Sequence, residues 1–101
     1  MSQETDGDDL GTYQLRLYVT GNTARSVRAI QSIRTFCDQH LSGQYRLEII
    51  DIHQQPEMAR QEQLIAAPTL IKRSPLPLRR LVGDMSQSGR VMAGLGLSGR
   101  G

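Results

Sequence analysis

The sequence of 101 residues has no tryptophan, a single cysteine and only four aromatic residues. The lone Cys37 cannot form an internal disulfide, and it leaves no second thiol for a redox pair within the chain. No apolar run approaches the roughly 18 residues that a membrane-spanning helix needs, and the acidic start lacks the basic and apolar regions of a signal peptide. We therefore expect a cytoplasmic protein that does not enter a membrane.

Residues for metal or acid–base chemistry are also scarce. His40 and His53 are the only histidines, and no cysteine or carboxylate cluster surrounds them at ligand spacing. A zinc site needs three or four converging ligands, so we expect no metal and no cofactor. Glu48 and Asp51 lack a motif partner and are interpreted as solvated positions on a strand. The sequence predicts a protein that is not an enzyme.

Charge is distributed unevenly along the chain. Residues 1–12 contain four acids and no base, so the remainder holds twelve bases against six acids, within a net charge of +2. We interpret residues 1–12 as a disordered acidic arm, 13–97 as one domain and 98–101 as a flexible tail. The basic domain can attract nucleic acid, phosphate or an acidic protein face.

The first half of the domain has clear secondary-structure patterns. Residues 13–20 alternate apolar and polar side chains, as a half-buried strand does. Gly21, Asn22 and Thr23 supply turn and helix-cap chemistry, and apolar residues recur at helical spacing up to Leu41, before the Ser42-Gly43 stop. A second apolar strand over 45–52 completes a right-handed βαβ unit with parallel strands. Pro56 begins a short helix running to about Ile65.

The second half is ambiguous. Residues 69–72 and 78–82 are interpreted as two strands around a turn at 74–77, although its prolines are equally compatible with irregular or helix-bounding roles. A final helix follows, with Ser86 as its cap and three glycines weakening it. The predicted order β-α-β-α-β-β-α is the α/β topology of the thioredoxin-like fold.

The position of a redox motif in that topology holds no thiol. Residues 20–24 read Thr-Gly-Asn-Thr-Ala where a redox member carries Cys-x-x-Cys. Cys37 falls on the apolar stripe of the helix, which predicts core packing. The backbone amides at Gly21-Asn22-Thr23 open a helix and can receive an anion, yet the spacing and the lysine of a P-loop are missing.

A basic cluster flanks the proline turn, and because alternate side chains of a strand share a face, at least two members should project together. The cluster consists of Lys72, Arg73, Arg79 and Arg80. Charge on edge strands discourages unwanted sheet pairing, which is one interpretation. An acidic protein partner is the other. Nucleic acid is disfavoured, because aromatic residues for base stacking are few.

Four stretches follow one another along the domain: LRLYVTGNTARSVRAIQSI, PEMARQEQLIAAPTLIK, LPLRRLVGDMS and VMAGLGL. Together they resemble the KaiB family of circadian clock proteins, and the match covers residues 13–97 without gaps. The resemblance implies a non-enzymatic regulator that binds a KaiC-like ATPase, recruits KaiA and displaces a SasA-type kinase, so modulating KaiC phosphorylation. It also implies a metamorphic chain, in which a tetramer of β-α-β-β-α-α-β order exchanges with a thioredoxin-like monomer that binds the partner.

The resemblance also assigns residues. It implies partner-binding roles for Arg28, Lys72 and Arg80, to which the basic cluster adds Arg79. Pro68 stands where thioredoxins have a cis-proline, so a cis bond is expected there. The positions expected to matter for structure or fold switching are Pro68, Pro75, Pro77, Gly83, Asp84, Gly94 and Gly96. Gly96 replaces a family aspartate, which favours the thioredoxin-like monomer.

Two other functions stay open at this point. One is a KaiB-like paralogue, or a SasA-type sensory adaptor module, in stress or other signalling outside a clock. The other is thiol–disulfide exchange, which the missing dithiol disfavours.

Overall fold

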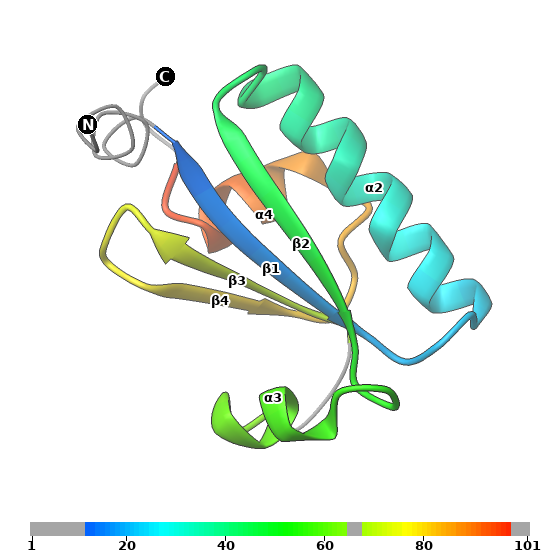
Figure 1. Ribbon diagram of the computed structural model, residues 1–101. Helices are drawn as coiled ribbons and strands as arrows, with labels where there is room; N and C mark the ends of the chain where they lie inside the picture. Colours follow the sequence, from blue (N-terminus) through cyan, green and yellow to red (C-terminus); the bar gives the residue numbers. More distant parts are fainter. Residues whose placement is uncertain (1–11, 65–67, 98–101) are drawn as a thin grey trace.

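The computed structural model describes residues 12–64 and 68–97. Its elements follow the predicted order β-α-β-α-β-β-α (Figure 1). They are β1 (Tyr13–Val19), α2 (Ala24–His40), β2 (Tyr45–Asp51), α3 (Pro56–Gln61), β3 (Thr69–Ser74), β4 (Arg79–Val82) and α4 (Ser88–Gly94). The thioredoxin-like fold expected from the sequence is therefore the one that the chain adopts here. The predicted acidic arm and tail lie outside the described residues, except for Thr12.

One four-stranded sheet, in the order β2-β1-β3-β4, forms the centre of the domain. Strand β1 pairs in parallel with β2 and antiparallel with β3, which in turn pairs antiparallel with β4. The parallel pair follows from the βαβ unit, because a connection through a helix returns the chain to the same end of the sheet. The prolines lie between β3 and β4, so the predicted hairpin is confirmed.

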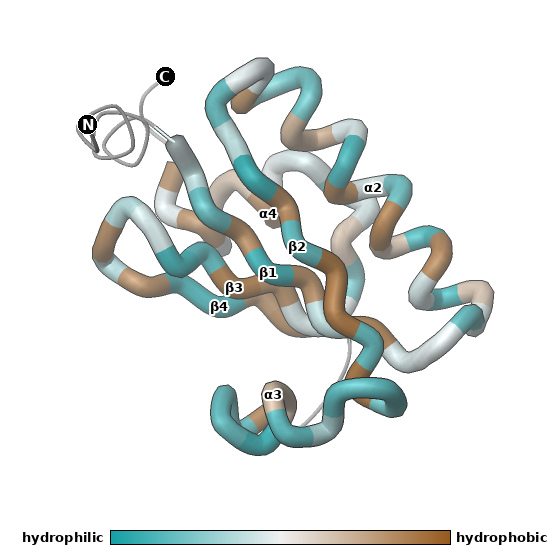
Figure 2. The backbone as a smooth tube through the Cα atoms, in the orientation of Figure 1, coloured by the Kyte–Doolittle hydropathy of each residue, from teal (hydrophilic) through white to brown (hydrophobic). Residues whose placement is uncertain are grey.

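The two faces of the sheet carry separate apolar clusters because side chains alternate along each strand. The larger cluster joins β1, β3 and β4 to α2 and α4, and includes Leu17, Ile33, Leu70 and Val91. The smaller one holds Tyr18, Ile50 and Ile71, with Met58 and Leu64 of the α3 region packed against it. Figure 2 shows how apolar and polar residues alternate along the central strands.

Helix α2 begins as predicted. The Thr23 hydroxyl accepts a hydrogen bond from the Ser26 amide, which is ordinary N-cap geometry. Cys37 is fully buried on the inner face of this helix, and burial raises the pKa of its thiol to about 12. Core packing of Cys37 is confirmed.

Several predicted boundaries differ from the structure. The cap of α4 is Gln87 rather than Ser86, because the Ser86 hydroxyl donates instead to Asp84 Oδ1, 2.7 Å away. Helix α3 ends at Gln61, earlier than predicted, and Ile65 lies outside the described residues. The Ser74–Pro75 and Leu76–Pro77 bonds are cis. The expected cis bond before Pro68 involves Ala67, which is also outside the described residues.

Candidate functional site

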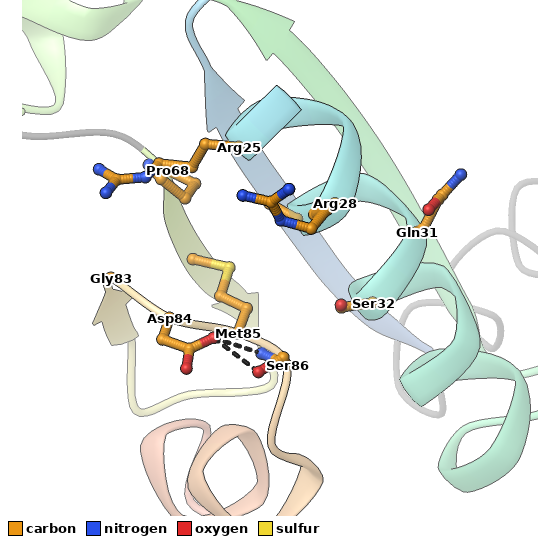
Figure 3. Close-up of a pocket in the computed structure, with 10 residues that line it drawn as sticks. Arg25, Arg28, Gln31, Ser32, Pro68, Gly83, Asp84, Met85 and Ser86 are labelled. Carbon is orange, nitrogen blue, oxygen red and sulfur yellow. Dashed lines mark hydrogen bonds between the residues drawn. The ribbon is translucent and has the colours of Figure 1, made fainter. Parts of the chain in front are cut away.

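A surface groove separates α2 from the segment that connects β4 to α4 (Figure 3). Its volume is about 580 Å³, within the range of ligand and peptide sites. One wall is the first half of α2, and the opposite wall is the segment 83–86, with Pro68 between them. The groove lies at the end of the sheet where β1 passes into α2.

Two arginines of α2 project from their helix toward the opposite wall of this groove. Arg25 and Arg28 are three residues apart, so they share one face of the first helical turns. Neither makes an ion pair or a side-chain hydrogen bond within the described part of the chain. The first turn of α2 contains no acidic residue, and cations are disfavoured at the positive end of a helix. The groove thus holds two cations that lack an anionic partner within residues 12–64 and 68–97.

The other wall is held in place by hydrogen bonds. Asp84 Oδ1 accepts from the Ser86 amide at 2.9 Å and from its hydroxyl at 2.7 Å, and these bonds lower the pKa of the Asp84 carboxyl. Arg90 donates to the carbonyl oxygens of Val82 at 2.8 Å and of Asp84 at 3.1 Å. The wall is therefore pre-formed, and its one carboxylate is engaged locally.

Between β1 and α2, where redox thioredoxins carry their cysteines, the chain has a network of hydroxyl groups. The buried Ser26 hydroxyl accepts from the Thr20 amide at 3.1 Å and from the Thr23 hydroxyl at 2.9 Å, while Thr23 caps the Ser26 amide. The Gly21 amide donates to Asp51 Oδ1 at 3.1 Å. These partners occupy the amides of Gly21 and Ser26, so an anion role for the turn, which the sequence already disfavoured, gains no support. Asp51 has the structural role of an acceptor for this loop.

The groove collects four of the predicted site residues, namely Arg28, Pro68, Gly83 and Asp84. Arg25 was missed by the sequence reasoning. A basic residue three positions before Arg28, two positions after the Thr23 cap, was the signal that could have identified it. The remaining predicted residues lie elsewhere on the domain.

Lys72 and Arg79 face each other on β3 and β4, on the side of the sheet that α4 covers. The expectation that two members of the basic cluster project together is met by this pair. Lys72 is only 4 % exposed, and burial together with the charge of Arg79 lowers its pKa. Gly96 adopts a positive φ of 74°, and a Cβ there would come within 3.0 Å of Arg79 Nε. Lys72 is thus buried within this contact, whereas Arg79 is exposed.

Arg80 lies on the opposite face of the sheet, since it pairs with Ile71 of the smaller cluster. Its guanidinium donates to the carbonyl oxygen of Glu62 at 2.9 Å. Pro75 and Pro77 flank Leu76, which is 79 % exposed at the tip of the hairpin. Gly94 packs beneath Leu81, whose Cδ1 would meet an added Cβ at 3.0 Å.

Within residues 12–64 and 68–97, no group of three or more histidine, cysteine or carboxylate residues is placed to hold a metal ion. No described helix is long and apolar enough to cross a membrane.

Solved structures with a similar fold include the N-terminal domain of Synechococcus elongatus SasA, with a TM-score of 0.70, 20 % identity and 87 % of each chain covered. Chloroplastic thioredoxin z gives a TM-score of 0.69 at 14 % identity, covering 95 % of this chain and 88 % of the other. At these identities the likeness concerns the fold, which is thioredoxin-like.

Sequence relatives are closer. The circadian clock protein KaiB3 of Synechocystis sp. is 47 % identical over 87 residues, which cover 86 % of this chain and 85 % of the relative. The circadian clock oscillator protein KaiB of Gloeothece citriformis is 43 % identical, with 85 % and 81 % covered. The profile of the KaiB domain matches residues 16–97. The chain belongs to the KaiB family of circadian clock proteins.

Proposed function

We propose that this chain is a non-enzymatic regulator that binds a KaiC-like ATPase hexamer in its thioredoxin-like form, through the groove between α2 and residues 83–86. Binding there modulates the phosphorylation state of the ATPase and the recruitment of KaiA-like and SasA-like partners. Family membership supports the clock-related role, and the geometry of the groove supports the mode of binding.

The observation that carries this proposal is the pair Arg25 and Arg28, which have no ion-pair partner among the described residues and face a pre-formed wall. Charge-assisted hydrogen bonds from arginine to a carboxylate are directional and often bidentate, so such a pair selects acidic groups on a partner. The one carboxylate of the groove, Asp84, is engaged by the amide and hydroxyl of Ser86, which supports a docking role for this surface.

Binding of the purified full chain to a purified KaiC-type hexamer tests the proposal. Association is measured by interferometry with ATP, with ADP and with a non-hydrolysable ATP analogue. Arg28→Ala should weaken binding about ten-fold or more, which is typical of losing a central arginine contact. Arg34→Ala is the matched control, because Arg34 is an exposed arginine of α2 outside the groove. Its affinity should change less than two-fold.

No binding in any nucleotide state, or equal losses in both variants, would contradict the proposal. Binding to a KaiC-type ATPase that takes no part in rhythmic phosphorylation would identify a KaiB-like paralogue acting outside a clock. Arg80→Ala requires a separate stability measurement, because Arg80 also binds the backbone of Glu62.

A further inference from the structure

The groove continues along α2 beyond the arginines. A second hollow, lined by Thr35, Phe36, Gln39 and Ser88, shares four wall residues with the first: Gln31, Ser32, Met85 and Ser86. The combined groove therefore follows α2 from Arg25 to Gln39. The fourteen steps between these two residues span about 21 Å at the helical rise of 1.5 Å per residue.

The open end of the combined groove lies at the end of the domain where β1 starts. Helix α2 runs back along the sheet after β1, and Tyr13, the first residue of β1, donates its amide to the Gln44 carbonyl just past the end of α2, at 2.9 Å. Residues 1–11 thus join the described domain beside the Gln39 end. An extended chain covers at most about 3.3 Å per residue, so six or seven residues suffice to reach Arg25.

The charges of the two segments are complementary. Residues 1–11 carry Glu4, Asp6, Asp8 and Asp9 and no base. The far end of the combined groove carries Arg25 and Arg28, without ion-pair partners in the described part of the chain, against one carboxylate, Asp84, which Ser86 engages. Between the ends, serine, threonine and glutamine side chains of the walls can bond the amides and carbonyls of an extended peptide, which need partners when they leave water.

We propose that residues 1–11 occupy this combined groove, with the acidic side chains of Glu4 and Asp6 at Arg25 and Arg28. The acidic segment is then an internal competitor for the site. The effect of this competition on partner binding rests on the proposed function. The docking of residues 1–11 in the groove does not. A segment that occupies the groove about 80 to 90 % of the time lowers the affinity of a partner about five- to ten-fold.

Docking is tested on the full chain by paramagnetic relaxation enhancement. A nitroxide is attached to Ser2→Cys, and Cys37 stays unlabelled because it is fully buried with a raised pKa. Broadening is expected at amides of residues 25–32 and 83–88, and not at Arg46 or Arg73 on the other face. The broadening should decrease in Arg28→Gln and stay unchanged in Arg34→Gln. It should also decrease in the unmodified chain at about 1 M salt, where the screening length is about 3 Å.

Broadening that is absent, or equal in both variants, or centred on Arg46 and Arg73 would overturn the proposal. In a second measurement, the variant Glu4→Gln/Asp6→Asn/Asp8→Asn/Asp9→Asn should bind the KaiC-type hexamer five- to ten-fold more tightly than the unmodified chain. Docking without partner binding rejects the proposed function alone. Partner binding with no broadening and no gain in the neutralised variant rejects the docking of residues 1–11 alone.

Discussion

Arg80 donates a hydrogen bond to the backbone carbonyl of Glu62, 2.9 Å away, and so joins the edge strand β4 to the end of α3. The Glu62 carboxylate is 15 % exposed and pairs with Arg73 Nη1 at 2.6 Å and with Arg16 Nη1 at 3.5 Å. One residue after α3 therefore holds arginines from three neighbouring strands. We call Glu62 and these three arginines the Glu62 clamp.

The Glu62 clamp should contribute to stability. In Glu62→Gln the carboxylate charge is lost while the shape is kept, so Arg16 and Arg73 lose their shared anion. We expect the free energy of unfolding to fall by about 1 to 2 kcal/mol, allowing for the partial exposure of Arg73. Urea denaturation followed by circular dichroism measures it. The control is Glu57→Gln, because both side chains of the Glu57–Arg60 pair are 70 % exposed. This variant should lower the free energy of unfolding by less than about 0.5 kcal/mol.

The Glu62 clamp also bears on how Arg80→Ala is interpreted. If the clamp is structural, Arg80→Ala lowers stability and loosens α3 even when no partner is present. Equal unfolding free energies of Arg80→Ala and the unmodified chain would show that the bond to Glu62 contributes nothing. Any loss of partner binding would then belong to Arg80 itself.

Lys72 is the only lysine of the chain, and its pKa is lowered from 10.5 by burial and by Arg79. Between the lowered pKa and the ordinary one, the unfolded chain binds more protons than the folded chain. The free energy of unfolding therefore increases as pH rises through that interval. The ¹³Cε resonance of this single lysine should titrate below 10.5, and a midpoint at or above that value would refute the shift.

Replacing Lys72 tests the same burial at neutral pH. Lys72→Met keeps the length of the side chain and removes a charge that has no acidic partner in the described part of the chain. We expect the free energy of unfolding to increase by about 1 kcal/mol, and its increase with pH in the alkaline interval to vanish. Arg46→Met on the exposed side of β2 is the control and should change stability little. A destabilised Lys72→Met would mean that the ammonium is favourably held.

Replacing either of two glycines near the end of the chain by alanine should change stability, but in opposite directions. Gly89 lies in the first turn of α4 with open space around its Cα, so Gly89→Ala should stabilise the fold by about 0.5 to 1 kcal/mol. Gly96 has a φ of 74° and Arg79 3.0 Å from an added Cβ. Gly96→Ala should therefore destabilise by about 1 kcal/mol or more. Thermal unfolding of both variants checks the signs, and a stabilised Gly96→Ala would show that this turn rearranges freely.

The sequence predicted what depends on local pattern. The alternation over 13–20, the cap chemistry at 21–23 and the apolar stripe through Cys37 each involve residues close in the chain, so β1, α2 and the βαβ unit were predictable. Ser86 was misassigned as a cap because Asp84, two residues earlier, competes for the same hydroxyl. The Glu62 clamp was not predictable, because it joins positions that are up to 46 residues apart.

The same limit applies to the candidate site. Arg28 and Pro68 were each singled out, but their position in one groove follows from the packing of α2 beside residues 83–86. Alternation separates Lys72 from Arg73 and Arg79 from Arg80, but which side chains meet across the hairpin depends on strand register. Arg73 lies at a register shift of β3 against Gln14 and Leu15, which no sequence pattern predicts.

Cys37 should be unreactive in the folded chain. Its thiol is fully buried and its pKa is raised to about 12, because burial disfavours the thiolate and the charge of Asp38 adds to the effect. At pH 8 the thiol is therefore protonated in the folded state. Reaction with an aromatic disulfide reagent should therefore occur at the rate at which the chain opens, and should become fast in denaturant. A rapid reaction of the native chain would contradict the assignment of Cys37 to the core, and with it the argument that no thiol chemistry operates in this fold.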